Sequence, residues 1–216
     1  MSDTLGDMKD RIADELARFD LTSQIANAIN DAVSAYEDER FFFNETRAIT
    51  FSSVSGQEFY DGSDNTLLDA LQKIDYIILY MNNTPFKLRA EVPSIMELNS
   101  QNGLLQGPPL SYCYYAQSIR FYPVPNNDTW TFRVGASIKI AAPASDIEVG
   151  NPWMMRTGAE RLIRSRAKLE LSLHVLKDEE MAQTMATAVN EAYNQLMGRT
   201  AQLTQIGQGR VMPMDF

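Results

Sequence analysis

The chain has 216 residues, of which 44% are hydrophobic and 22% are charged, a balance typical of a folded protein with its own core. Its formal charge of -9 argues against tight binding of a nucleic-acid backbone over the whole surface. The single cysteine excludes an intramolecular disulfide and a cysteine-rich zinc site, and no apolar run approaches the roughly 20 residues that span a bilayer.

Residues 4–40 have the apolar spacing of two amphipathic helices, because hydrophobic side chains recur every three or four positions. These positions are Leu5, Met8, Ile12, Leu16 and Phe19 in the first helix and Ile25, Ile29, Val33 and Tyr36 in the second. Thr4 and Thr22 stand where helix N-caps occur, and Asp7 follows Thr4 at capping-box spacing. The short connection at residues 20–21 predicts that the two helices are antiparallel neighbours.

Residues 41–150 change to the alternation and turn signals of short β-strands. We expect strands at residues 48–51, 58–60, 74–81, 86–92, 112–116, 119–123 and 130–140, with the last three forming a meander. The pair Asn82-Asn83 predicts a hairpin turn between two of these strands. Short helices are expected at residues 66–73 and 93–99, the second with a proline at its first position.

Two longer helices are expected next, from about residue 151 to Leu176 and from Asp178 to about Met197. Asp178 is placed to act as the N-cap of the second helix, and Gly198 is placed to end it. The residues that follow are rich in glutamine, threonine and glycine, so we expect an extended C-terminal tail.

Together these elements predict an α+β fold in a single domain over residues 1–198. Its helices, at residues 4–40 and 151–198, are expected to close as an antiparallel bundle made of an N-terminal and a C-terminal helix pair. A β-rich insertion at residues 41–150 projects from this bundle, and the C-terminal tail occupies residues 199–216.

Residue types that could carry out chemistry are scarce. His174 is the only histidine, which excludes an HExxH zinc motif and any site that needs two imidazoles. The sequence has no GxSxG nucleophile motif, no phosphate-binding P-loop and no GxGxxG dinucleotide motif. We therefore expect no catalytic residue, no metal and no cofactor. The alternative from another class is an enzyme that uses carboxylates on a metal, whose activity chelation would abolish.

Charge is distributed unevenly along the chain. The first two helices are acidic, whereas the segment after Trp153 is basic. Segments of opposite sign can pair within one subunit or between copies of it, and two solvated helix faces are the alternative. The candidates for such salt bridges are Asp14, Glu15, Asp31, Arg161, Arg164 and Arg166.

Arg166 interrupts an apolar stripe that otherwise continues from Leu162 to Leu169. An arginine in that position needs a carboxylate partner or an exit to water, because an unpaired buried charge is costly. We expect Arg166 to pair with an acid of the first two helices and so to set the register of the bundle. Extension of the side chain to the surface is the alternative.

The opening TLGDMKDRIADELARFDLTSQIANAINDAVSAYEDERFFFNE resembles the start of tailed-bacteriophage head–tail adaptor (connector) proteins. The resemblance continues through GQEFY and SIRFYPVP and ends in GAERLIRSRAKLEL, so it covers nearly the whole chain. These motifs are patterns of packing and turns, and they indicate a role in assembly.

The resemblance implies a structural virion protein, not an enzyme. Members form a ring, commonly dodecameric, that docks below the portal, extends the DNA channel and provides the platform for tail attachment. The implied partners are the portal protein, copies of the chain itself, a downstream tail or nozzle protein, and DNA that passes without specific binding; no membrane is involved. The implied location is the neck between capsid and tail, after assembly in the host cytoplasm. A neck stopper or another tail component is the alternative, although stoppers are usually more fully β.

Two sets of residues are candidates for contacts with other proteins. Members of the family that this chain resembles reach onto the portal with a C-terminal extension. In this chain the corresponding residues are Arg210, Met212, Met214 and Phe216. The alternating spacing of the last three suits an extended segment on a partner surface, and a disordered tail is the alternative. The turns at Asn82, Asn83, Asn126 and Asn127 are candidates for contact with the next tail component.

Overall fold

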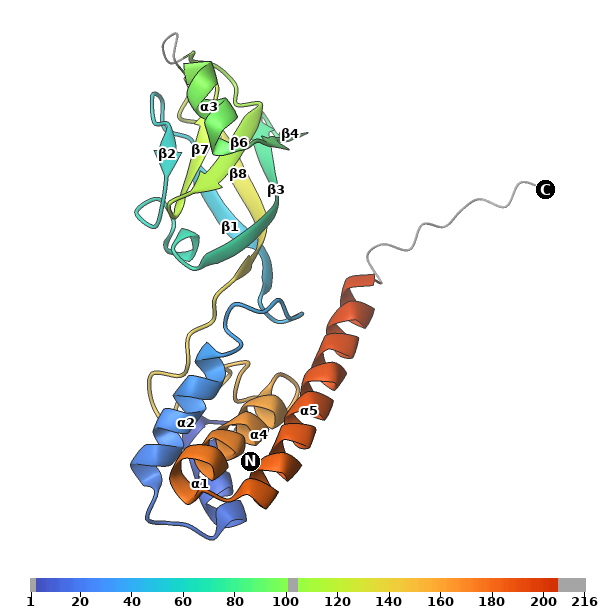
Figure 1. Ribbon diagram of the computed structural model, residues 1–216. Helices are drawn as coiled ribbons and strands as arrows, with labels where there is room; N and C mark the ends of the chain where they lie inside the picture. Colours follow the sequence, from blue (N-terminus) through green and yellow to red (C-terminus); the bar gives the residue numbers. More distant parts are fainter. Residues whose placement is uncertain (1–2, 101–104, 206–216) are drawn as a thin grey trace, which may run out of the picture. The chain divides into compact units, whose positions relative to one another are not determined.

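The computed structural model describes residues 3–100 and 105–205. Over these residues the protein is α+β, as expected, with five α-helices and two four-stranded β-sheets. The chain divides into two compact units: unit 1 comprises Met1–Phe43 and Ile140–Phe216, and unit 2 comprises Asn44–Lys139 (Figure 1). Unit 2 corresponds to the expected β-rich insertion with narrower bounds. The single domain expected over residues 1–198 stays a prediction.

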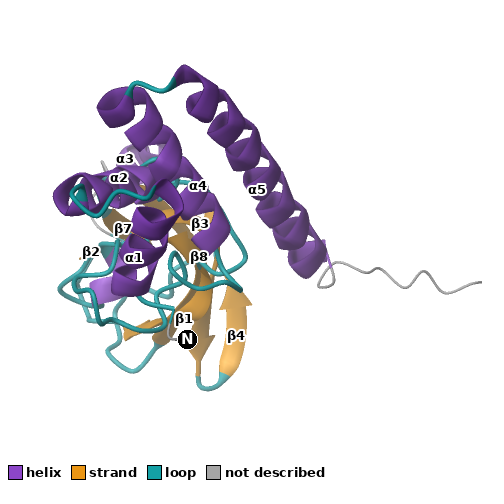
Figure 2. Cartoon of the chain, turned by 90° about the horizontal axis from the view of Figure 1, so that it is seen from below, coloured by secondary structure: helices purple, strands orange, loops and turns teal. Residues whose placement is uncertain are grey.

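Unit 1 is built from helices that share one hydrophobic core. Its elements are α1 (Leu5–Leu16), α2 (Thr22–Ser34), α4 (Glu160–Leu171), the π-helix η2 (Ser172–Leu176) and α5 (Glu179–Gln205). Helix α4 packs against both α2 and α5, and α1 packs against α2 and α4. In Figure 2, α4 accordingly lies between α1 and α5.

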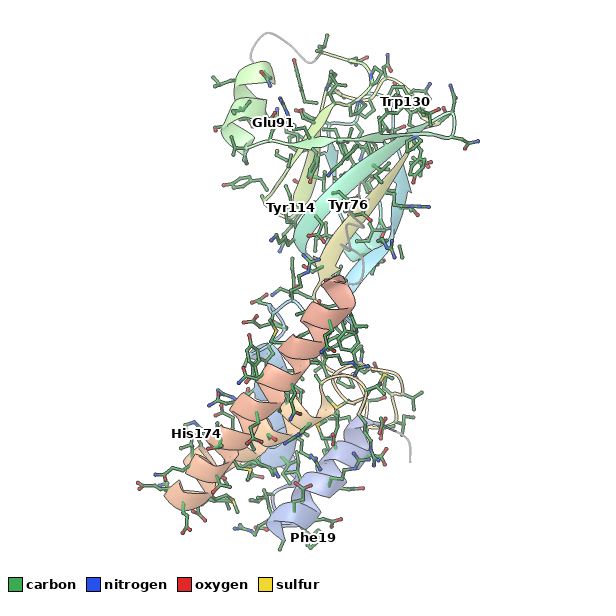
Figure 3. The ribbon with its side chains drawn as sticks, turned by 90° about the vertical axis from the view of Figure 1, so that its right-hand side faces the viewer. Phe19, Tyr76, Glu91, Tyr114, Trp130 and His174 are labelled. Carbon is green, nitrogen blue, oxygen red and sulfur yellow. The ribbon has the colours of Figure 1, made fainter. Side chains whose placement is uncertain are left out.

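The core of unit 1 follows the helical spacing of apolar residues. Its deeply buried aliphatic members include Met8, Ile12, Ile25, Ile29, Val33, Leu162 and Ile163. Burial of each such side chain contributes about 1.5–3 kcal/mol, so this face fixes which side of each helix turns inward. The pattern fails at Phe19, which is 72% exposed beyond the end of α1 (Figure 3). Ala17 adopts a left-handed conformation with φ 51° and ends that helix first.

The N-terminal caps agree only in part with those expected. The capping box of α1 is confirmed, since Asp7 N donates to Thr4 Oγ1 at 3.1 Å and Thr4 N donates to Asp7 at 3.2 Å. Asp178 also caps α5 as expected, accepting from Met181 N at 3.0 Å. The assignment of Thr22 as an N-cap was wrong: Thr22 is the first residue of α2, and Leu21 stands in the capping position.

Helix α4 begins later than the expected start near residue 151. Residues 151–159 form turns, because the Asn151 side chain bonds to the backbone in place of a helical partner. Its Oδ1 accepts from Trp153 N at 3.1 Å, and its Nδ2 donates to the Ala141 carbonyl at 3.1 Å. Helical spacing in this segment is therefore not sufficient to form a helix.

Helix α5 continues past Gly198 to Gln205, so the expectation that Gly198 ends it was wrong. Thr200 holds the additional turns in place: its Oγ1 donates to the Leu196 carbonyl at 3.0 Å and accepts from Phe42 N at 3.3 Å. A glycine inside a helix costs about 1 kcal/mol, which packing at the buried Thr200 can offset. The start of the tail at residue 199 is corrected accordingly.

The first sheet of unit 2 has the order β1-β8-β3-β4 and is antiparallel throughout. Its strands are β1 (Glu45–Ser52), β8 (Thr131–Ile138), β3 (Leu71–Met81) and β4 (Thr84–Lys87). The hairpin turn at Asn82-Asn83 between β3 and β4 is confirmed, with φ 51° and 64°. Asparagine tolerates such positive angles better than most residues do.

The second sheet has the order β2-β7-β6-β5, in which β5 and β6 are parallel. Its strands are β2 (Phe59–Tyr60), β7 (Ser118–Tyr122), β6 (Ser111–Tyr115) and β5 (Arg89–Ala90). The expected meander was therefore wrong in its last strand, because β8 belongs to the first sheet. The reason is packing: Phe132 of β8 stacks on Phe121 of β7 with ring centroids 4.0 Å apart, within the core that both sheets share.

Two short helices complete unit 2. Helix α3 (Pro93–Ser100) confirms the helix expected at residues 93–99. The helix expected at residues 66–73 is only a 3-10 turn, η1 (Thr66–Leu68), before β3 begins. Asn65 caps this turn by accepting from Leu67 N at 2.9 Å. The buried Leu71 and the residues after it then pair with β8, and this pairing prevents the helix from continuing.

Candidate functional site

Ion pairs join α1 to α4 along one side of unit 1. Glu15 accepts from Arg164 Nη1 and from Lys168 Nζ, each at 2.6 Å. One turn earlier, Arg11 Nη1 donates to Oε1 of the buried Glu160 at 3.1 Å. The structure therefore brings together Arg164 and Glu15, two residues selected from the charge pattern of the sequence.

The other charge candidates are distributed differently. Arg161 Nη2 lies 3.5 Å from Glu191 of α5, so this pair joins the two C-terminal helices. Asp14 and Asp31 are exposed and form no ion pair within residues 3–100 and 105–205. The acidic and basic segments thus pair within one subunit at some positions and leave charges of both signs at the surface.

The partner expected for Arg166 was wrong. Its Nη2 lies 2.6 Å from Glu170 Oε1, one turn further along the same helix. A carboxylate at i+4 is held within reach by the helix itself, so this pair forms without any adjustment between helices. Arg166 also lies near Tyr36, where burial raises the pKa of the phenol and the guanidinium charge partly opposes that rise.

A pocket lined by three arginines lies between the start of α4 and the second half of α5. It has a volume of about 200 Å³, and Arg156, Arg161 and Arg199 surround it. Arg161 Nη1 donates to Gln195 Oε1 at 2.8 Å. Alanine and leucine side chains of both helices also line the pocket: Ala159, Leu162, Ala192 and Leu196. We call this feature the arginine pocket.

Of the three arginines that line this pocket, the charge pattern of the sequence selects only Arg161. The expectation that Gly198 ends the helix assigns Arg199 to the C-terminal tail. The spacing from Leu196 to Thr200 was the available signal that the helix continues. In the structure the Arg199 guanidinium donates to the Thr157 carbonyl and lies 4.5 Å from the Phe42 ring centroid.

Aromatic side chains pack together where the chain leaves unit 1, at Phe43, and close to where it returns, at Ile140. Phe41 and Phe43 pack edge-to-face on Trp153, with centroids 5.9 and 5.3 Å from its ring. Trp153 is fully buried, and its Nε1 donates to the Ile140 carbonyl at 2.7 Å. The run Phe41-Phe42-Phe43 is therefore part of the packing of unit 1.

In unit 2, Arg120 joins three elements. It is 7% exposed on β7, and its guanidinium donates to Glu58 before β2 and, at 2.6 Å, to Glu97 of α3. The same group lies 5.3 Å from the Phe59 ring centroid. These contacts of the buried Arg120 hold α3 against β7. The charge pattern of the sequence does not indicate this role.

The asparagine turns lie at one end of the first sheet. The turn at Asn82-Asn83 follows the last residue of β3, which is adjacent to the start of β8, and residues 126–127 lie just before β8. Asn82, Asn83 and Asn126 are exposed. Asn127 has a local structural role, because its Oδ1 accepts from Thr129 N at 2.7 Å.

Four of the selected residues lie outside the described part of the chain, namely Arg210, Met212, Met214 and Phe216. The contact with the portal expected of them stays a prediction.

The described residues also include the groups that could carry out chemistry. His174 is 73% exposed on η2, and its Nε2 lies 3.3 Å from Glu170 (Figure 3). Burial raises the pKa of the Cys113 thiol. Among residues 3–100 and 105–205, no group of three or more histidine, cysteine or acidic side chains is arranged to hold a metal ion. Within the same residues, none of the helices combines the length and the apolar composition needed to span a membrane.

Comparison with known proteins assigns the chain to a family. No curated protein matched the sequence. The model of one protein family, described as SU10 adaptor protein, matches residues 3–213. That match includes the helices of unit 1 and the whole of unit 2. The chain therefore belongs to the SU10 adaptor protein family, a family of phage head–tail adaptors.

Proposed function

We propose that copies of this chain form a ring below the portal, which extends the DNA channel and provides the platform for tail attachment. The family match carries this proposal, because the model of the SU10 adaptor protein family matches residues 3–213 of this chain. A dodecameric ring is the expected stoichiometry, by resemblance to connector proteins. Its place is the neck of the virion between capsid and tail, after assembly in the host cytoplasm.

Exposed apolar side chains on unit 2 support a role in protein contacts. They are concentrated in α3 and in the segments that flank it: Val92, Ile95, Leu98, Leu105 and Leu110. Each is at least 42% exposed, and Leu110 is 70% exposed. Apolar surface of this kind favours association with another protein. We assign the downstream tail or nozzle protein to unit 2, including its turns at Asn82-Asn83 and at residues 126–127.

The antiparallel bundle of N-terminal and C-terminal helix pairs is part of this proposal. The shared core of α1, α2, α4 and α5 supports it, as do the ion pairs between α1 and α4. Contact with the portal is assigned to Arg210, Met212, Met214 and Phe216 beyond the end of α5.

The net charge of -9 supports a DNA conduit that does not bind its cargo. Acidic surface repels the phosphate backbone, so DNA slides along the channel and does not adhere to it. Specific recognition of DNA sequence is not part of the proposal.

Native mass spectrometry of the purified protein, alone and mixed with its portal ring, tests the proposal. We expect the portal ring to gain a fixed number of copies, near twelve. A chain that ends at Gln205 keeps every described helix and serves as the matched variant for the portal contact. It should fold, as measured by circular dichroism, but should fail to join the portal. Absence of association by the full chain under any condition would remove the portal as a partner.

The contact with the next tail component has its own test. Replacement of Asn82-Asn83 by Asp-Gly keeps a turn of the same type but changes the exposed side chains. We expect heads that carry this variant to fill with DNA and to attach fewer tails. Unchanged tail attachment would move the contact to another part of the surface.

A further inference from the structure

The arginine pocket combines positive charge with a concave shape. Arg156 and Arg161 have 58% and 52% of their side chains exposed, and Arg199 is also exposed. A guanidinium carries five N–H donors, so Arg161 and Arg199 keep donors beyond their contacts with Gln195, Glu191 and the Thr157 carbonyl. Arg156 lies 3.6 Å from Asp3 and Arg161 lies 3.5 Å from Glu191, so two carboxylates of the same chain balance part of the positive charge. Arg199 adds a third cation at the same opening, and a further anion placed among the three is attracted by the charge that is left.

The pocket favours a carboxylate on a protein over the phosphates of duplex DNA. Its lining includes alanine and leucine side chains, against which the methylene group of an acidic side chain can pack. A volume of about 200 Å³ is large enough for an acidic side chain. Arginine also binds planar carboxylates with two parallel hydrogen bonds.

This chain itself presents a matching acidic surface. Asp10 and Asp14 are exposed on α1 at a spacing of four residues, so they lie on the same face of the helix. Neither forms an ion pair within the described part of the chain. Like charges at this spacing destabilise a helix, and a cationic partner from outside the chain reverses that effect.

The two surfaces belong to different sides of the helical unit. Helix α1 packs on α4, and α4 packs on α5; Figure 2 shows α4 between the other two helices. A contact between α1 of one copy and the α4–α5 pocket of another therefore joins unlike surfaces. Such head-to-tail contacts generate a ring when the rotation between copies closes.

We infer that the arginine pocket of one copy receives Asp10 and Asp14 of the next copy. This inference rests on the proposed ring and names the residues that connect its subunits. The contact is a set of charge-assisted hydrogen bonds between Arg156, Arg161 and Arg199 on one subunit and two carboxylates on its neighbour.

Charge reversal on each side tests the contact. Arg161→Glu and Asp14→Lys each place like charges opposite one another, and each should weaken ring formation on the portal by about tenfold or more. The double variant restores opposite charges in exchanged positions and should recover association to within about threefold of the wild type. Arg133→Glu in unit 2 is the matched control: Arg133 is exposed, and its reversal should leave ring formation unchanged.

Both single variants are expected to fold, because the altered side chains are exposed, and circular dichroism checks this. If either charge-reversed variant forms the ring as well as the wild type does, the inference is overturned and the proposed function stays intact. Loss of assembly in the single variants without recovery in the double variant would also overturn the specific pairing.

A cross-linking experiment separates the inference from the portal proposal. In a Cys113→Ser background, copies that carry Asp14→Cys are mixed with copies that carry Arg161→Cys and are treated with a short bismaleimide reagent, with and without the portal ring. The reagent spans the distance that the arginine side chain occupies, which is too long for a direct disulfide, and each chain has one thiol, so a cross-link reports contact between copies. We expect dimers at a yield at least about fivefold above that of the Arg133→Cys control.

The outcomes are distinct. Cross-links from a protein that never joins the portal would support the inference and reject the proposed function. Portal association without cross-links above the control would reject the inference and support the proposed function.

Discussion

Arg164 and Glu15 form an ion pair at 2.6 Å that joins α4 to α1, 149 residues apart in the sequence. Lys168 contacts the same carboxylate, also at 2.6 Å. Glu15 thus links two cations on successive turns of α4. Both helices belong to unit 1, and we expect this contact to help set the register of α1 on α4.

Loss of this link should destabilise unit 1 by a small amount. A double-mutant cycle of Glu15→Gln and Arg164→Gln should give a coupling of about 0.5–1 kcal/mol, since the pair is partly exposed and screened by solvent. Urea unfolding measures each free energy. The pair between Arg18 and Asp20 is the control, because it joins neighbouring positions in a loop and no two helices. Zero coupling between Glu15 and Arg164 would show that packing alone sets the register.

Gly198→Ala should stabilise the protein by about 0.5–1 kcal/mol. Gly198 lies within α5, and a Cβ at this position meets no atom within 4 Å. Alanine therefore gains helix propensity without a clash. Thermal unfolding followed by circular dichroism measures the change.

The control for this substitution is Gly56→Ala. Gly56 has φ +81°, a left-handed conformation that alanine adopts at a cost of about 1 kcal/mol, so this variant should be destabilised. Destabilisation of Gly198→Ala as well would indicate that the helix ends at Gly198, contrary to the structure.

Arg120→Ala should destabilise unit 2 by about 3 kcal/mol or more. The change removes the cation that Glu58 and Glu97 share, and it leaves the mostly buried Glu58 carboxylate without this partner. Chemical unfolding followed by tryptophan fluorescence reports the loss, because one of the two tryptophans, Trp130, lies in the core of unit 2. Arg133→Ala is the comparison: its exposed guanidinium lies over Tyr80, and its removal should change stability by less than about 0.5 kcal/mol.

Cys113 should react slowly with thiol reagents while the protein is folded. Burial raises the pKa of its thiol, so the reactive thiolate is a smaller fraction at any given pH than in an exposed cysteine. At pH 8 we expect alkylation about a hundredfold slower than in urea, with a rate that continues to rise above the ordinary pKa of cysteine. Equal rates in the folded and unfolded protein would contradict the buried position of the side chain.

Local pattern was sufficient to predict the elements whose ends are set by their own residues. The capping box of Thr4 and Asp7, the N-cap at Asp178 and the hairpin at Asn82-Asn83 all involve neighbours in sequence. Their hydrogen bonds form between groups a few residues apart, so they are visible in the order of residues alone. The α+β class and the recognition of the family rest on the same local signals.

Charge pattern predicted only part of the candidate site. It selected Glu15, Arg161 and Arg164, but it missed Arg199 and gave Arg166 the wrong partner. Which carboxylate a long arginine side chain reaches depends on neighbours from other helices and on the i+4 position of its own helix. That competition is decided only when the helices are packed.

The sequence by itself determined the α+β class and most of the helices and strands, because the period of apolar residues and the capping groups are properties of short segments. The tertiary structure decided that α5 passes Gly198: the spacing from Leu196 to Thr200 allows the helix to continue, and the contact of Thr200 with Phe42, distant in the sequence, holds the additional turns. It also decided that β8 joins the first sheet, since Phe132 packs across the core on Phe121. Both outcomes depend on burial between segments distant in sequence, and no local pattern records that burial.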